Sequence, residues 1–138
     1  MSYSLRVQDG DLVQSGSHLG IVFGVDKLKQ DINLWLMEEY GGDRFHLNMG
    51  SILQDFIGGI ANESARSEIH GEVLRVIQNY QALQVRRFKE NPESMSASEL
   101  LVSVDKVDTA LSYDTVSVMI RLRNGSRQST TIRFARTL

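Results

Sequence analysis

The hydrophobic pattern of this chain changes its period once, close to its single proline, Pro92. From about residue 25 to that point apolar side chains recur at the 3.6-residue spacing of helices, and after it they alternate with polar ones, as in half-buried strands. Helices first and strands last are typical of the α+β class with an antiparallel sheet. The 138 residues suit one domain, 1–138, with a helical part at about 25–91 and a β part at about 99–136.

Three segments of the helical part have apolar stripes, and they predict helices over about 25–40, 52–60 and 64–90. The last is the clearest, because nothing interrupts its pattern before the proline. The first 24 residues predict only short extended pieces with turns. In the β part, alternation predicts strands near 100–105 and within a hairpin at 116–136.

The register of the hairpin can be argued from its turn, Asn124-Gly125. A two-residue loop would set Ile132 opposite Ser117 and divide the apolar residues between two faces. A three-residue loop, 123–125, keeps them on one face, because a slip of one residue moves every side chain across the sheet. We therefore predict that Leu122 faces Ser126, with Gly125 in the left-handed conformation.

Charge is distributed unevenly along the chain. Residues 1–114 hold ten Lys/Arg and all seventeen Asp/Glu, whereas residues 115–138 hold five arginines and no acid. A split of this kind suggests a partner surface at the basic end. In the predicted register four arginines share the outer face, and the fifth lies on the other side at the end of the chain. The predicted partner-binding residues are Arg121, Arg123, Arg127, Arg133 and Arg136.

The residues give no positive sign of chemistry. There is no cysteine, and His18, His46 and His70 have no ligand partner at metal-binding spacing, so we predict no catalytic residue, metal or cofactor. A pair of carboxylates can hydrolyse a glycosidic bond when one is desolvated. However, Glu68 and Glu72 lie four residues apart on one helical face that we expect to be exposed, so a solvated face is the preferred interpretation for these residues and for Glu63.

Two further expectations concern location and nucleic acid. With no signal-like segment and no apolar run of membrane-spanning length, the chain is expected in the cytoplasm and away from membranes. The basic hairpin could neutralise phosphates, which makes a nucleic-acid-binding accessory protein the alternative function. Its single aromatic residue, Phe134, is predicted to face inward, so base stacking would be poorly served.

Three parts of the chain stand out together: LKQDINLWLMEEYGGDRFHLNMGSILQDFIG at 28–58, the helix EIHGEVLRVIQNY at 68–80, and the strands ending in 116–120 and 132–134. In these parts the chain resembles the baseplate wedge, or sheath-initiator, family of contractile phage tails, whose relatives occur in type VI secretion baseplates. Many members of the family carry a Glu-Pro-Arg motif at the end of the long helix. Here that region reads Tyr-Gln-Ala-Leu at 80–83, so no residue role is carried over from the motif.

The resemblance implies a structural, non-enzymatic virion protein in several copies around the tail axis. It implies contacts with other baseplate wedge proteins and with tail sheath subunits, and with the tail tube or hub as further neighbours. The C-terminal strands would present an edge that the first sheath ring extends by strand addition. Such a protein would reside in the virion tail baseplate and in the host cytoplasm during assembly of the contractile injection system.

Overall fold

The structure is a computed structural model that describes residues 3–8, 11–37, 50, 63–111 and 115–137. It confirms the α+β class, since two helices accompany antiparallel strands within these residues. The helix expected at 52–60 lies outside the described residues.

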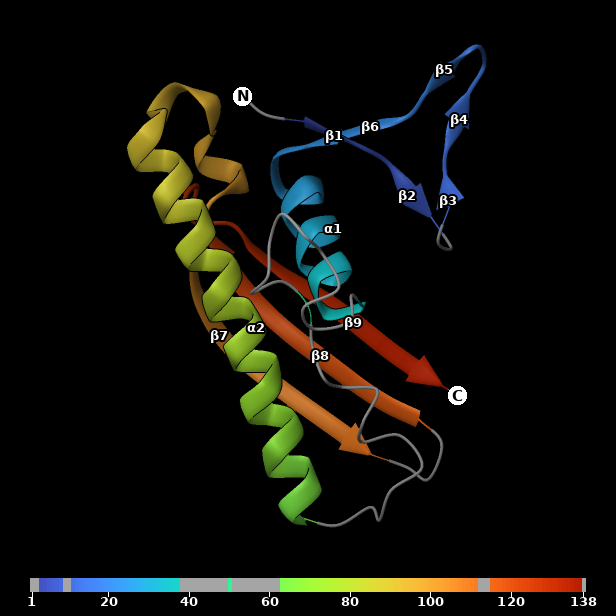
Figure 1. Cartoon of the computed structure of the whole chain (residues 1–138), viewed down its shortest axis with the longest axis vertical. Helices are drawn as coiled ribbons and strands as arrows, with labels where there is room; N and C mark the ends of the chain where they lie inside the picture. The colour runs from blue at the N-terminus through green and yellow to red at the C-terminus, as the bar shows by residue number, and fades with distance from the viewer. Residues whose placement is uncertain (1–2, 9–10, 38–49, 51–62, 112–114, 138) are drawn as a thin grey trace.

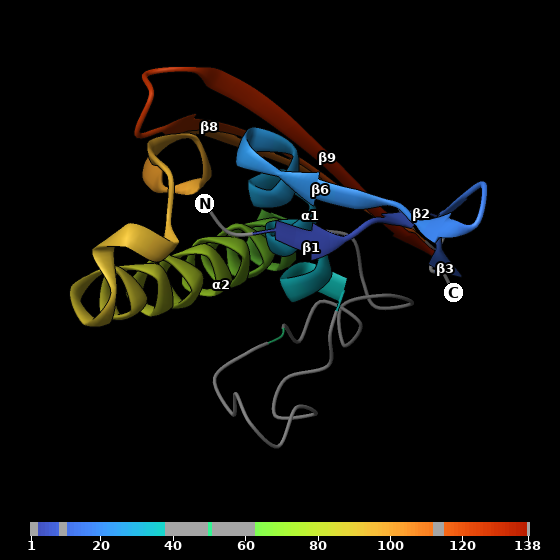
Figure 2. The same cartoon turned by 90° about the horizontal axis from the view of Figure 1, so that it is seen from above.

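A three-stranded antiparallel sheet and two helices form the body of the molecule. The sheet consists of β7 (Leu101–Leu111), β8 (Thr115–Asn124) and β9 (Ser129–Thr137), in the order β7-β8-β9. Helices α1 (Gly24–Met37) and α2 (Glu63–Glu90) lie on the same side of the sheet, α1 against β9 and α2 against β7 (Figures 1 and 2). The opposite face of the sheet has no layer over it among the described residues.

The core lies between the helices and the sheet, as the sequence pattern predicts. Trp35 of α1 meets Tyr80 of α2 edge to face, with 5.4 Å between the ring centroids. Trp35 is thus a core residue. The buried apolar residues are Leu28, Ile32, Trp35, Leu36, Ile69, Val73, Val76, Ile77, Tyr80, Leu101, Val116, Val118, Ile120, Leu122, Ile132 and Phe134.

The predicted pairing of the hairpin strands is wrong, but their side chains lie on the predicted faces of the sheet. Leu122 pairs with Thr130 rather than with Ser126, and the loop comprises Gly125–Arg127. The observed pairing differs from the predicted one by an even number of residues. Each side chain of the two strands therefore stays on its predicted face of the sheet. The predicted inward set is buried: Val116, Val118, Ile120, Ile132 and Phe134.

A contact outside the hairpin explains where the loop forms. The left-handed residue is Arg127, with φ of 63°, and not Gly125. Gly125 is needed for another reason: a Cβ there would lie 2.6 Å from the carbonyl oxygen of Ala97. Asn124 is buried beside it and donates its side-chain amide to the carbonyl oxygen of Ser98 at 2.9 Å. The segment before β7 therefore fixes the turn.

That segment is held to α2 by one buried amide. Two short 3-10 helices, η2 (Pro92–Ser94) and η3 (Ala97–Glu99), lead from α2 into the sheet. The Gln84 side chain donates to the carbonyl oxygen of Glu99 at 2.7 Å and accepts the main-chain N–H of Leu101 at 2.8 Å. Gln84 thus fixes the start of β7 against the helix.

Residues 3–8 and 11–23 form an arm of three small two-stranded ribbons, which the sequence predicted only as short extended pieces. A ring of main-chain hydrogen bonds joins the ribbons: Arg6 donates to Gly20 at 2.8 Å, Gly20 to Val13 at 2.7 Å, and Val13 to Arg6 at 3.0 Å. The paired strands are β1 (Tyr3–Leu5) with β6 (Ile21–Phe23), β2 (Val7–Gln8) with β3 (Asp11–Leu12), and β4 (Gln14–Ser15) with β5 (His18–Leu19).

Candidate docking edge

Three of the five predicted partner-binding arginines lie together. Arg121, Arg123 and Arg133 are exposed on the open face of the sheet, because they alternate with buried residues of β8 and β9. Arg127 is exposed in the loop and not on a strand, which corrects its predicted place on the outer face. For Arg136 the structure describes the main chain only.

Strand β7 brings acidic residues to the same face, so this face is not purely basic. Arg123 contacts Asp105 with 3.4 Å between nitrogen and oxygen, and Lys106 contacts Asp108 at 3.2 Å. Arg121 and Arg133 have no acidic partner among the described residues. These two arginines, rather than all five, form the unneutralised part of the face.

The two edges of the sheet differ in regularity. β7 has register shifts at Val102 and Asp105, and the side chain of Gln81 already donates to the carbonyl oxygens of Leu101 and Val102 at 3.1 Å. Bulges and charges of this kind are how proteins protect an edge from further pairing. β9 pairs with β8 over its full length without a shift. β9 is therefore the edge better suited to accept another strand.

The main-chain groups that point away from β8 can be identified. Asn124 donates its N–H to the carbonyl oxygen of Gln128 at 3.0 Å, which makes this a hydrogen-bonded pair. Antiparallel strands alternate such pairs with pairs whose main-chain groups point outward. In β9 the outward groups belong to the odd-numbered residues, and Thr131 and Arg133 are the two in the middle of the strand.

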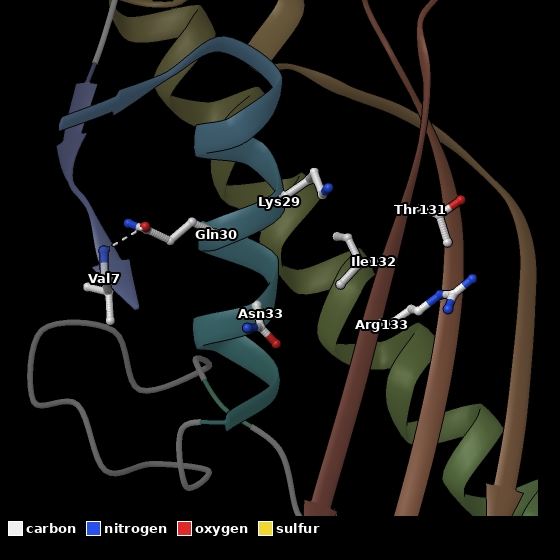
Figure 3. A pocket seen from close by; sticks show the side chains of 7 residues that line it. All are labelled: Val7, Lys29, Gln30, Asn33, Thr131, Ile132 and Arg133. Carbon is white, nitrogen blue, oxygen red and sulfur yellow. Dashed lines mark hydrogen bonds between the residues drawn. The ribbon is translucent and has the colours of Figure 1, made fainter. Parts of the chain in front are cut away.

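A trough of about 410 Å³ runs beside this edge (Figure 3). Lys29 and Asn33 of α1 form its floor, and Val7 of the arm stands on the far side of α1 from β9. No acidic residue lines the trough, although Asp26 lines the hollow next to it. The side-chain oxygen of Asn33 is buried without a hydrogen-bond partner in the described part of the chain.

One glutamine of α1 attaches the segment Leu5–Val7 of the arm beside the trough. Gln30 accepts the main-chain N–H of Val7 at 2.9 Å and donates to the carbonyl oxygen of Leu5 at 2.8 Å. The Gln30 side chain thus binds one main-chain N–H and one main-chain carbonyl oxygen of the arm, as a neighbouring strand would. Sequence reasoning did not single out Gln30, Lys29 or Asn33, whose only signal is a place on the polar side of a helical pattern.

The carboxylates weighed for hydrolysis do not share an exposed face. Glu72 is buried, which corrects the expectation that it is solvated, and it accepts two hydrogen bonds from Arg75, one of them 2.8 Å long. Glu68 is exposed, and the side chain of Glu63 lies outside the described residues. Within the described ranges, no group of three or more histidines and acidic residues could hold a metal ion.

A second buried polar cluster joins the two helices. The Tyr80 hydroxyl donates to Asp31 at 3.0 Å and accepts the Gln84 side chain at 3.1 Å. Burial raises the pKa of Tyr80 well above its ordinary value, and the neighbouring Asp31 carboxylate raises it further. Asp31 also contacts Lys27. Tyr80 and Gln84 are buried and Asp31 is partly buried, so the cluster joins the two helices at the edge of the core.

Sequence reasoning also missed an apolar face on the arm. On the ribbon of β1 and β6, Tyr3 pairs with Phe23 and Leu5 pairs with Ile21, so all four share one face. Their exposed fractions run from 43% for Leu5 to 67% for Tyr3. Exposed apolar patches commonly mark contact surfaces. The alternation that could have predicted this face is only three residues long in each strand.

No family model matches this chain, and no curated protein matches its sequence. Among the described residues, no helix has both the length and the apolar character needed to cross a bilayer.

Proposed function

We propose that this protein is a structural component of a phage tail baseplate wedge, without catalytic activity, that links wedge proteins to the first sheath ring and initiates sheath assembly. In this proposal β9 accepts an extended segment of a sheath subunit as an added strand. The observation that carries the proposal is the unshifted β9 edge, whose outward main-chain groups have no partner among the described residues. Strand addition requires such an edge.

The charge of the open face supports the same role. Arg121 and Arg133 would attract an acidic partner and would disfavour pairing between two copies of this edge, because like charges would meet. The nucleic-acid alternative gains no support from this face. Its aromatic residue, Phe134, is buried with 5% exposure, and two aspartates lie among the arginines.

The test is to block the outward N–H of β9 without touching the β8 ladder. Proline at Thr131 removes one outward donor, and edge strands tolerate proline at such positions. Thr109 of β7 is the matched control, because it opposes Val118 and also points away from β8. We expect tails carrying Thr131→Pro to lack sheath, while Thr109→Pro tails assemble normally. Normal sheaths on Thr131→Pro tails would remove the proposal.

A further inference from the structure

We infer that the trough between β9 and the arm binds one extended, acidic segment of a partner protein, and that the arm is the second wall of this binding site. The inference rests on the proposed function, because it specifies the chemistry of the strand that β9 accepts. It adds two claims: the segment carries carboxylates, and residues outside the sheet select it.

The geometry of β9 sets how the segment would lie. A strand added to β9 would follow Thr131–Arg133 and extend the sheet past the outer side of α1. In Figure 3, Ile132 points toward α1, whereas Thr131 and Arg133 lie on the other side of the strand. Because side chains alternate along an added strand, every second one would face α1 and the rest would face the open side. Each side therefore selects its own set of side chains.

Both the α1 side and the open side of the β9 edge carry positive charge. Lys29 faces the trough on the α1 side, and Arg133 and Arg121 lie on the open side. None of the three has an acidic partner among the described residues, and no acid lines the trough. A segment with carboxylates on either side would neutralise these cations, whereas a basic segment would be repelled.

A polar group in the trough also lacks a partner. The side-chain oxygen of Asn33 is buried and accepts no hydrogen bond in the described part of the chain. Unpaired buried acceptors are rare because they cost free energy. Asn33 and Lys29 give the trough a partly polar lining beside the β9 edge, which suits an occupant with polar side chains.

The arm closes the trough on the side away from the sheet. Gln30 binds the main chain of Leu5 and Val7, so the distance between Val7 and β9 is fixed by α1. A ribbon of two or three residue pairs is marginal by itself, so this attachment contributes to fixing the position of the wall, together with the direct connection of β6 to α1. Loss of the Gln30 side chain should free the wall without disturbing the core, because Gln30 is not part of the core cluster.

The experiment uses the full chain and two short synthetic peptides, one alternating glutamate with valine and the other lysine with valine. Amide hydrogen exchange followed by NMR is the main readout. When the acidic peptide is added, the N–H groups of Thr131 and Arg133 should exchange at least about tenfold more slowly, as ladder amides do. The amides of Ile132 and Phe134, already bonded to β8, should change little. The lysine peptide should leave all four unchanged.

Two variants separate the parts of the inference. Lys29→Glu should lower the affinity for the acidic peptide by about tenfold. Lys106→Glu on β7 changes the net charge by the same amount and should have little effect on this affinity. Gln30→Ala should release the arm, which would appear as faster amide hydrogen exchange at Val7. It should also lower the affinity for the acidic peptide. If Val7 exchanges faster while the affinity is unchanged, the arm is not a wall of the site.

Other outcomes overturn the inference outright. These are equal binding of both peptides, no protection by the acidic peptide at millimolar concentration, protection of Thr131 and Arg133 by self-association alone, or displacement of the peptide by duplex DNA. The tail experiment tests the proposed function separately from the peptide experiment. If the peptide protects Thr131 and Arg133 but Thr131→Pro tails assemble normally, the trough stands and the proposed function does not.

Discussion

At the scale of single residues, Gly125 shows how a contact distant in sequence decides a local conformation. Asn-Gly marks a turn, but the glycine is required because Ala97 lies against it and not because its own φ is positive. The left-handed position falls on Arg127, which bears that strain because the buried amide of Asn124 accepts the N–H groups of Ser126 and Gln128. A sequence pattern could place the turn but could not reveal the neighbour that fixes it.

The two glycines Gly125 and Gly71 should therefore respond in opposite ways to alanine. Gly125→Ala should lower the free energy of unfolding by about 1–3 kcal/mol, because the new Cβ meets a main-chain oxygen that cannot move aside easily. Gly71 lies inside α2 with nothing within 4 Å of a Cβ, so Gly71→Ala should raise it by about 0.5–1 kcal/mol. Urea denaturation measures both, and a stable Gly125→Ala variant would contradict the proximity to Ala97.

Tyr80 gives the stability of the protein a dependence on alkaline pH. Its pKa is raised in the folded state, by burial and then by Asp31, above the unfolded value of 10.0. Above that pH the unfolded state releases the phenolic proton while the folded state retains it, so the free energy of unfolding falls as pH rises. The fall should approach about 1.4 kcal/mol per pH unit. Tyr80→Phe should remove this slope in urea titrations at pH 10–11, and an unchanged slope would assign it to other groups.

At the scale of elements, periodicity was a reliable guide wherever an element has a buried face. The helix over 64–90 and the hairpin strands were predicted from apolar spacing, and their buried residues occupy the expected faces. The strand predicted near 100–105 is β7, which extends to Leu111, and its register shifts bury Leu101 and leave Val102 54% exposed. The register of the hairpin was not predicted correctly. Shifting the pairing by any even number of residues keeps the same side chains on the same face, and only the contact with η3 determines which pairing forms. The arm was missed because its ring of hydrogen bonds uses main-chain atoms, which leave no pattern in the sequence.

The joint between α2 and β7 should be sensitive to the loss of one side chain. Gln84→Leu keeps the volume but removes the buried hydrogen bonds that Gln84 makes to the Leu101 N–H and to the Glu99 carbonyl oxygen, which should cost about 2–4 kcal/mol in the free energy of unfolding. Gln81→Leu is the matched control, since Gln81 binds carbonyl oxygens at the partly exposed rim and should cost less than about 1 kcal/mol. Equal losses in thermal or urea denaturation would show that the joint is not set by Gln84.

At the scale of the whole molecule, charge along the chain and charge across the surface are different quantities. The sequence predicts a basic C-terminal hairpin, and Arg121, Arg123 and Arg133 do lie on the open face. The fold places β7 beside them, so Asp105 and Asp108 reduce the basic area. It also brings Lys29, distant in sequence, to the edge of β9. The candidate site was therefore predicted in part: its strand was identified, but its opposite wall depends on tertiary structure.

This difference predicts that arginines of the same face are unequal. Arg121→Glu combined with Arg133→Glu removes the two unpaired cations, and it should slow sheath assembly because steering of an acidic partner is lost. Arg123→Glu combined with Lys106→Glu changes the net charge by the same amount, but these cations are already compensated by β7. That pair should have a much smaller effect. The measurement is the yield of sheathed tails over time by electron microscopy.

Folding is the control for both pairs, because all four side chains are exposed and exposed ion pairs contribute only about 0–1 kcal/mol. Both double variants should therefore melt within a few degrees of the parent protein. If the two pairs slow assembly equally, net charge and not the local arrangement guides the partner, and the β9 edge loses its electrostatic argument. If only the pair containing Arg133 slows assembly, and added salt reduces the difference, encounter is guided to the side of the sheet where the ladder is still open.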